Sequence, residues 1–148
     1  MKFVCFLAAF TLILSSCKKE DVINQNNNTS SISWKIQGND YIDNSPVINI
    51  NSSNVLTIDA SDNESNVRLI VYNFSSLSNG SEISLNNLTD KAYITYYGID
   101  YTDTQNGSVV FSDILDNKLS GSFNFSCREL VNFQSVTVSD GVFSNITY

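Results

Sequence analysis

The sequence contains no histidine, and it has only three cysteines and one proline among its 148 residues. Without an imidazole the chain cannot form Ser-His or Cys-His nucleophile pairs, HExxH metalloprotease helices, or zinc and copper sites that depend on ring nitrogens. Most familiar hydrolase mechanisms are therefore excluded. We expect a protein that is not an enzyme and that uses no cofactor and no metal.

Positive charge is also scarce. Eight Lys and Arg stand against fifteen Asp and Glu, which gives a formal net charge of -7. A nucleic-acid-binding surface needs basic side chains that neutralise phosphates, so we expect no nucleic-acid partner. The length of 148 residues suits one folded domain that buries enough apolar surface to be stable without disulfides.

Residues 1–16, MKFVCFLAAFTLILSS, begin with a charged residue, continue with an apolar run and end with two small polar residues. The run is shorter than the roughly 20 residues that a membrane-spanning helix needs, which predicts a cleaved secretory signal. Leu14-Ser15-Ser16-Cys17 resembles the lipobox of bacterial lipoproteins. The resemblance implies cleavage before Cys17, a diacylglycerol thioether on its sulfur and acylation of its new amine. The mature protein would then be anchored in a membrane by two or three acyl chains.

Residues 17–31 follow the predicted cleavage site and contain mostly Asn, Gln, Ser and Thr. They have too little apolar content to pack, so we interpret them as the lipidated Cys17 and a flexible tether. Residues 18–21, KKED, resemble the signal that sends some Bacteroidetes lipoproteins to the outer face of the outer membrane. A linker that faces the periplasm is the alternative, so the sequence leaves the side of the outer membrane open.

Cys127 is the only cysteine that would keep a free thiol, because Cys5 leaves with the signal and Cys17 carries lipid. No intrachain disulfide is then possible. Cys127 ends an alternation of apolar and polar residues that starts at Leu119. We therefore expect its thiol on the buried face of a strand, where it is inert.

Residues 32–148 show apolar alternation with a period of two, interrupted by clusters of Asn, Ser, Asp and Gly. This pattern predicts an all-β domain in which nine or ten short strands form an antiparallel meander, folded into a β-sandwich or a flattened barrel. Asp140-Gly141 predicts a two-residue hairpin turn, and Gly121 predicts a bulge or a close approach of strands. The expected strands are residues 32–36, 47–50, 55–58, 67–74, 83–85, 92–97, 109–114, 118–126, 134–139 and 142–148.

Several segments share a layout with known proteins: a strand, turn and aromatic at 34–41, a Tyr-rich hairpin at 93–101 followed by 107–111, and closing segments at 119–125 and 136–148. Together they resemble a family of small Bacteroidetes-type lipoproteins that carry an uncharacterised β-rich domain. The resemblance covers nearly all of the mature chain. It implies no activity and no catalytic residues.

The densest candidate site is the cluster of Tyr93, Tyr96, Tyr97 and Tyr101 around Gly98, and Tyr93, Tyr97 and Tyr101 are its expected ligand-binding residues. Tyrosine rings stack on sugar rings while their hydroxyls form hydrogen bonds. If residues 92–97 form a strand, Tyr93 and Tyr97 share one face. We predict a glycan-binding platform there, and a structural role at the edge of the core is the alternative.

The carboxylates suggest catalysis or metal binding only weakly. Paired carboxylates hydrolyse glycosides when they lie about 5 to 9 Å apart, and oxygen clusters bind Ca²⁺. All of these carboxylates lie beside turns, where Asp commonly bends the chain, and the 59–64 loop lacks the spacing of a calcium-binding loop. The residues considered are the pairs Asp100/Asp103 and Asp113/Asp116, and the loop residues Asp59, Asp62 and Glu64.

Taken together, these features predict a lipid-anchored, non-catalytic binding module at the outer membrane, with a glycan as the expected ligand. The alternative is a structural or assembly lipoprotein that docks on an envelope protein.

Overall fold

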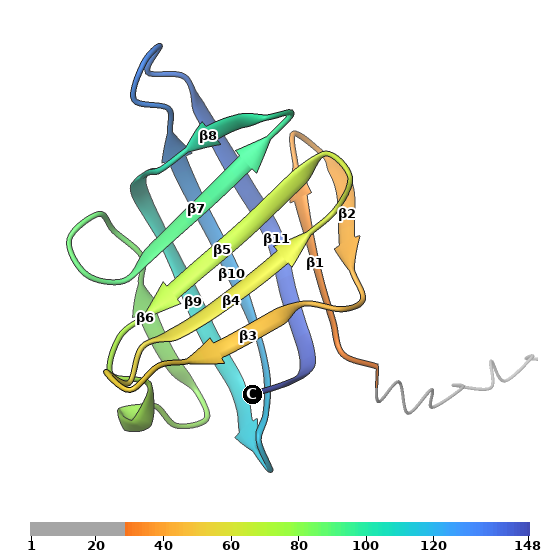
Figure 1. Ribbon diagram of the computed structural model, residues 1–148, viewed down its shortest axis with the longest axis vertical. Helices are drawn as coiled ribbons and strands as arrows, with labels where there is room; N and C mark the ends of the chain where they lie inside the picture. The colour runs from red at the N-terminus through yellow and green to blue at the C-terminus, as the bar shows by residue number, and fades with distance from the viewer. Residues whose placement is uncertain (1–28) are drawn as a thin grey trace, which may run out of the picture.

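The computed structural model describes residues 29–148, which form two antiparallel sheets (Figure 1). The six-stranded sheet has the order β2-β1-β11-β10-β9-β6, and the five-stranded sheet has the order β3-β4-β5-β7-β8. The predictions for residues 1–16 and for Cys17 lie outside the described residues. The strands are β1 (Ser31–Ile36), β2 (Asn39–Asp43), β3 (Val47–Ile50), β4 (Leu56–Ser61), β5 (Ser65–Val71), β6 (Ser81–Ser84), β7 (Lys91–Tyr96), β8 (Ile99–Tyr101), β9 (Asp103–Leu115), β10 (Lys118–Arg128) and β11 (Ser135–Thr147), with one 3-10 turn, η1 (Phe74–Ser76).

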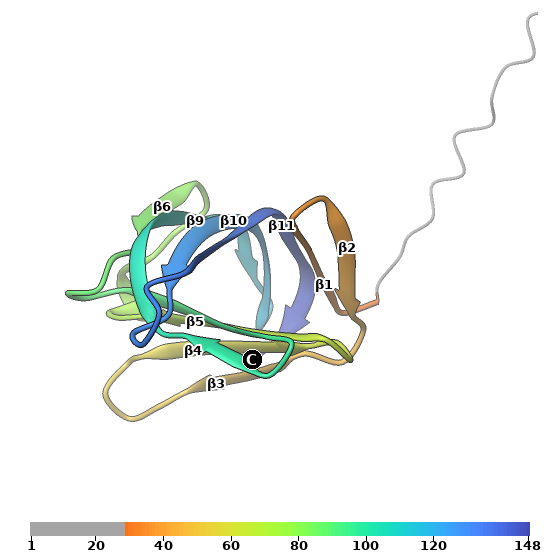
Figure 2. The same cartoon turned by 90° about the horizontal axis from the view of Figure 1, so that it is seen from above.

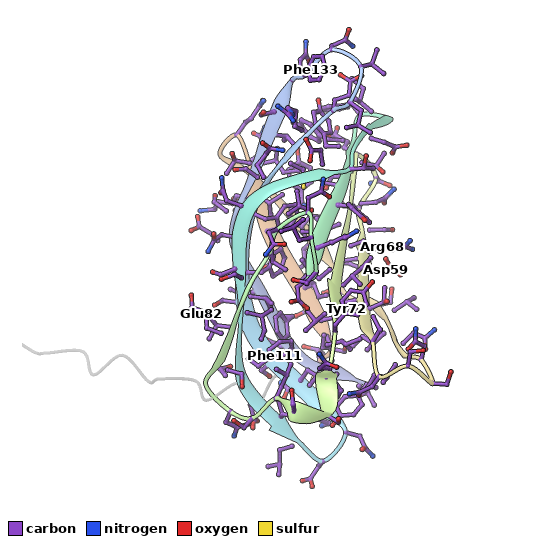
Figure 3. The ribbon with its side chains drawn as sticks, turned by 90° about the vertical axis from the view of Figure 1, so that its left-hand side faces the viewer. Asp59, Arg68, Tyr72, Glu82, Phe111 and Phe133 are labelled. Carbon is purple, nitrogen blue, oxygen red and sulfur yellow. The ribbon has the colours of Figure 1, made fainter. Side chains whose placement is uncertain are left out.

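The predicted all-β fold is confirmed, and of the two architectures that the sequence left open the structure has the sandwich, because the two sheets pack face to face and are not closed into a barrel. The strands of the two layers cross steeply in Figure 1, and the six-stranded sheet curls over the flatter five-stranded sheet in Figure 2. Alternate residues of each strand point into the space between the layers, as Phe111 does in Figure 3. Among residues 29–148 no helix is long and apolar enough to cross a membrane.

The core between the sheets is apolar and rich in aromatic side chains. Trp34 is fully buried, and its indole Nε1 donates a hydrogen bond of 2.9 Å to Ser65 Oγ on the opposite sheet. Within the described residues no buried side-chain nitrogen or oxygen is left without a partner. The core therefore meets the requirement that buried polar groups be hydrogen-bonded.

The predicted hairpin at Asp140-Gly141 is wrong, because both residues lie inside the continuous strand β11. A type I′ turn needs positive φ at both central residues. Asp140 has a φ of 50°, but Gly141 pairs directly with Phe123 on β10 as an ordinary strand residue. The register of β11 shifts at this point against both β1 and β10. Asp140 thus marks a β-bulge that bends the long strand.

Gly121 and Gly141 permit a close approach of side chains between β10 and β11. The ring of Phe143 covers Gly121, and the ring of Phe123 covers Gly141. A Cβ atom at Gly141 would lie only 2.6 Å from Phe123 Cδ2, and one at Gly121 would overlap both the Phe143 ring and the carbonyl oxygen of Val110. The predicted close approach at Gly121 is therefore confirmed.

Candidate functional site

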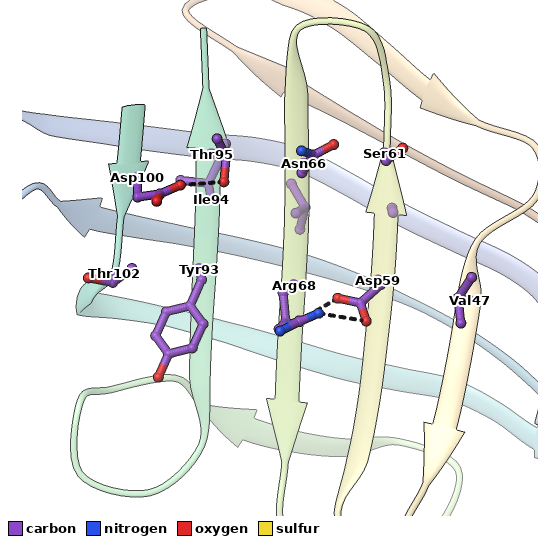
Figure 4. Close-up of a pocket in the computed structure, with 12 residues that line it drawn as sticks. Val47, Asp59, Ser61, Asn66, Arg68, Tyr93, Ile94, Thr95, Asp100 and Thr102 are labelled. Atoms are coloured by element: carbon purple, nitrogen blue, oxygen red, sulfur yellow. Dashed lines mark hydrogen bonds and ion pairs between the residues drawn. The ribbon is translucent and has the colours of Figure 1, made fainter. Parts of the chain in front are cut away.

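The outer face of the five-stranded sheet carries a shallow hollow of about 660 Å³ (Figure 4). We call it the strand-face hollow. Two rows of side chains line it, because residues paired across antiparallel strands project on the same side. The first row is Val47, Asp59, Arg68 and Tyr93, and the second row is Ser61, Asn66, Thr95 and Asp100.

An ion pair lies at the centre of the first row. Asp59 on β4 is paired with Arg68 on β5, whose Nη2 donates to Asp59 Oδ2 over 3.2 Å and whose Nε donates to Oδ1. The carboxylate raises the pKa of the guanidinium, chiefly through this hydrogen bonding. Both side chains are partly exposed, and Figure 3 shows them on the outer side of the sheet. These two hydrogen bonds, the Arg68 fork, hold the planar guanidinium of Arg68 in place and leave the donors on Nη1 for a ligand.

The second row adds further hydrogen-bonding groups. Thr95 Oγ1 donates a hydrogen bond of 2.7 Å to Asp100 Oδ1. The other carboxylate oxygen of Asp100 does not take part in this bond and can accept one from a ligand. The side-chain amide of Asn66 forms no hydrogen bond with another described residue, and it is exposed at the hollow. An amide of this kind offers one acceptor and two donors to a ligand.

Tyr93 is the aromatic residue of the hollow. It points outward from β7 and is half-buried, between Arg68 on one side and Thr102 on the other. In Figure 4 its ring lies along the sheet with its broad side turned to the viewer. A tyrosine in this position presents a flat apolar surface with a polar tip.

The three predicted tyrosines do not come together. Tyr97 does not share a face with Tyr93 as expected, because β7 ends at Tyr96 and Tyr97 has a φ of 48° in the following turn. Tyr101 is buried, with 6% of its surface exposed. Ligand binding by these residues stays a prediction, and Tyr93 is the one that lies in the hollow.

Tyr97 takes part in a different contact at the end of the sandwich. Its hydroxyl donates a 2.7 Å hydrogen bond to Glu64 Oε2, and its ring packs 4.6 Å from that of Tyr96. The hydrogen bond to Glu64 is the main reason why the pKa of Tyr97 rises to about 12. This contact joins the β4–β5 turn to the β7–β8 turn, since the Tyr97 amide also donates to the Glu64 carbonyl.

The predicted carboxylates lie in different surroundings. Asp100 faces the hollow, whereas Asp103 is buried and accepts hydrogen bonds from Arg128 at 2.6 and 3.0 Å and from Asn87 at 2.7 Å. Asp113 accepts from Asn79 over 3.4 Å. The remaining predicted carboxylates are Asp116 in the β9–β10 turn, and Asp62 and Glu64 in the β4–β5 turn. Within residues 29–148 no three His, Cys, Asp or Glu residues gather closely enough to hold a metal ion.

Cys127 lies on the inner side of β10, as predicted. Its Sγ donates to the carbonyl oxygen of Ala92 over 3.0 Å, and burial raises the pKa of the thiol to about 12. A buried thiol of this kind is a poor nucleophile at neutral pH.

Sequence reasoning missed Asp59, Arg68 and Asn66 as members of one site. The signal was present, because a hairpin closed by the turn at residues 62–64 pairs Asp59 with Arg68 and Ser61 with Asn66. Recognising it required the register of that hairpin, which alternation alone does not give.

Comparison with known proteins identifies one family. The family described as a domain of unknown function (DUF6252) matches residues 28–147, which is most of the chain. The protein belongs to this family. No curated protein and no solved structure matches the chain significantly.

Proposed function

We propose that this member of the DUF6252 family is a lipid-anchored, non-catalytic binding module that holds a glycan in the strand-face hollow. The observation that carries the proposal is the Tyr93 ring, which lies beside the guanidinium of Arg68 and near the second row, where Asn66 and one carboxylate oxygen of Asp100 are not used by other described side chains. The apolar face of a sugar ring stacks on an aromatic side chain, and neighbouring hydroxyls bind planar polar groups such as carboxylates, amides and guanidinium groups. Both requirements are present in one hollow.

The anchoring part of the proposal rests on the sequence before the described domain. Cys17 would carry the acyl chains, and β1 begins at Ser31, so about a dozen tether residues would separate the domain from an outer-membrane lipid surface. A Cys17→Ser variant is expected to move from the membrane fraction to the soluble fraction. Retention of this variant in the membrane would contradict lipid anchoring at Cys17.

A thermal-shift screen of the mature chain, made soluble by Cys17→Ser, tests glycan binding. A ligand at 100 times its dissociation constant adds about 2.7 kcal/mol, which shifts the midpoint by several degrees for a domain of this size. We expect Tyr93→Ala to abolish the shift and Tyr72→Ala to preserve it. Tyr72 is an exposed tyrosine just after β5 and does not line the hollow. A shift that survives Tyr93→Ala would place the ligand elsewhere.

A second candidate function is docking on an envelope protein, and the loop between β10 and β11 favours it. Leu130, Val131 and Phe133 are 61%, 78% and 65% exposed in this short loop. The loop is nevertheless well organised, because the guanidinium of Arg128 lies 5.4 Å from the centre of the Phe133 ring and is itself bound by the buried Asp103. Exposed apolar side chains on an ordered loop are typical of protein contacts.

The position of this loop supports the docking candidate. Figure 3 shows Phe133 at one end of the molecule, and the loop comes just before Ser135, whereas the start of β1 at Ser31 pairs with Ser144 far along β11. The tether therefore leaves from another part of the sandwich, about 30 Å along β11. A photo-crosslinker at Val131 is expected to capture a protein in cells that a crosslinker at Asn124, on the outer face of β10, does not capture. Equal capture from both positions would contradict the docking candidate.

A further inference from the structure

The strand-face hollow is much longer across the strands than along them. Five strands contribute side chains to it, but no strand contributes more than two outward-facing positions. Outward positions on one strand are about 7 Å apart, whereas four steps between neighbouring strands cover about 19 Å. The hollow is therefore a short trough that runs perpendicular to β4, β5 and β7.

The order of the groups along this trough follows from the register. Tyr93 and Thr102 lie at one end, Arg68 and Asp59 follow on β5 and β4, and Val47 lies at the other end on β3. The aromatic platform is thus near one end of the trough. A single sugar unit stacked on Tyr93 reaches Arg68 on the next strand, but it does not reach Val47.

We infer that the ligand is a linear oligosaccharide of about four units that lies across the strands, with one terminal unit stacked on Tyr93. This inference rests on the glycan-binding function proposed above. A hexose unit is about as long as the spacing between neighbouring strands. Each further unit therefore lies over the next strand, first at Arg68, then at Asp59 and finally at Val47.

The second row completes the trough as a binding surface. It runs parallel to the first row, about 7 Å away along the strands, which is close to the width of a sugar ring. A chain that lies over the first row directs hydroxyls toward Asn66 and Asp100. These two residues keep hydrogen-bonding capacity that other described side chains do not use.

Length-dependent binding tests this inference. The probes are cello-, manno-, xylo- and chito-oligosaccharides of one to six units, titrated by calorimetry into the mature chain with Cys17→Ser. For the sugar series that binds, we expect affinity to rise with each unit up to about four and then to level off. Tyr93→Ala should lose about tenfold or more at every length, because every chain stacks on that ring.

Asp59→Ala separates the distal part of the trough from the platform. It is expected to remove the gain in affinity from the third unit onward, since Asp59 lies two strands away from Tyr93. The gain from the second unit should fall as well, because Asp59 holds the guanidinium of Arg68, whereas the affinity for a single unit on Tyr93 should be kept. Asn124→Ala is the matched control on the outer face of the six-stranded sheet and should bind every length like the parent chain. Thermal midpoints of all three variants show whether each one is folded.

The possible outcomes distinguish this inference from the proposed function. Equal affinity for one and four units would overturn the inference and leave glycan binding intact. A plateau at two units would also overturn it, because that length fits a chain that runs along one strand. No binding in any of the four series would overturn both the inference and the proposed function.

Discussion

The outer faces of the two sheets differ in what their polar side chains do. On β9, β10 and β11 of the six-stranded sheet, small polar side chains bond to one another, as Ser126 does with Thr137 over 2.8 Å and Asn124 with Ser108 over 3.4 Å. The charged side chain of Lys35 on the same sheet forms ion pairs with Asp40 and Asp140. On the five-stranded sheet the polar side chains include a tyrosine and an ion pair, and part of their hydrogen-bonding capacity remains unused. The comparison teaches that one fold can combine a face whose polar groups bond to one another with a face that keeps free hydrogen-bonding capacity.

The two sheets also differ in how regularly their strands pair. The pairings of β10 with β9 and β11, and of β1 with β11, contain register shifts. The pairings between neighbouring strands of the five-stranded sheet run without a shift. A regular ladder keeps side chains aligned in rows across several strands, whereas a bulge displaces them. The regular sheet is therefore the better support for an extended site.

The largest effect that would break this comparison is expected at Gly121. Gly121→Val places a side chain against the Phe143 ring and the Val110 carbonyl, where no space exists. We expect it to lower the free energy of unfolding by about 3 kcal/mol, as overpacking of a rigid core does. Urea denaturation measures this loss.

Gly38→Ala is the matched control for that substitution. A Cβ at Gly38 meets nothing within 4 Å, although its φ of 84° disfavours alanine. We expect a loss of only about 1 kcal/mol from backbone strain. Equal losses in the two variants would show that overpacking between β10 and β11 costs no more than the backbone strain at an open position.

The strands could be predicted from sequence because alternation of apolar and polar residues reports which side of a sheet each residue faces. This holds for β10, where the alternation from Leu119 to Cys127 matches the buried face. It failed at β11, because Asp-Gly has the conformational preferences of a hairpin turn but also suits a bulge. Local preference did not distinguish these, since the decision depends on which strands lie on both sides of β11.

The candidate site could be predicted only in part. Tyr93 was expected in a binding surface because tyrosines cluster near it in the sequence, but the cluster is divided among a hollow, a turn and the core. The turn residue Tyr97 breaks the alternation, since its positive φ rotates its side chain away from the strand face. Asp59 and Arg68 became visible as partners of Tyr93 only after the register was known.

A smaller loss of stability is expected when the two ion pairs are broken. Asp103→Asn removes a buried carboxylate that binds both Arg128 and Asn87, so we expect a loss of about 2 kcal/mol in the free energy of unfolding. Asp59→Asn breaks the exposed pair with Arg68 and should cost no more than about 0.5 kcal/mol. If both variants lose the same amount in urea denaturation, burial does not distinguish the two pairs.

The pH dependence of unfolding tests the core between the two sheets, where Cys127 is buried. Burial raises the pKa of Cys127 to about 12 from an ordinary value of 9.0, so folding favours the neutral thiol. This contribution to stability is complete below pH 9 and is lost as the pH rises toward 12. We expect the thiol to lower the free energy of unfolding by at most about 1.4 kcal/mol per pH unit above pH 9. Tyrosines also begin to ionise in this range, so the contribution of Cys127 is the difference between the parent chain and a variant without the thiol.

Cys127→Ala is the control for this pH dependence. The alanine has no thiol to ionise in the unfolded chain, so the variant should show a flatter profile over the same pH range. A parent and variant with the same slope would indicate that the core around Cys127 admits the thiolate.

The smallest effect concerns Tyr97, in the β7–β8 turn of the five-stranded sheet. The hydrogen bond to Glu64 raises the pKa of Tyr97 to about 12, and the favoured neutral phenol is lost only as the pH rises past 10 toward 12. Glu64→Gln should lower the pKa of one tyrosine toward 10, as measured by ultraviolet titration. The thermal midpoint at neutral pH should hardly change. Asp100→Asn, a substitution inside the hollow, should leave the pKa of this tyrosine unchanged, because Asp100 bonds to Thr95 and the pKa of Tyr97 is set by Glu64 and Tyr96. If Asp100→Asn changed the pKa of the same tyrosine, Tyr97 would interact with the charged groups of the hollow. The turn and the sheet face could then not be treated as separate sites.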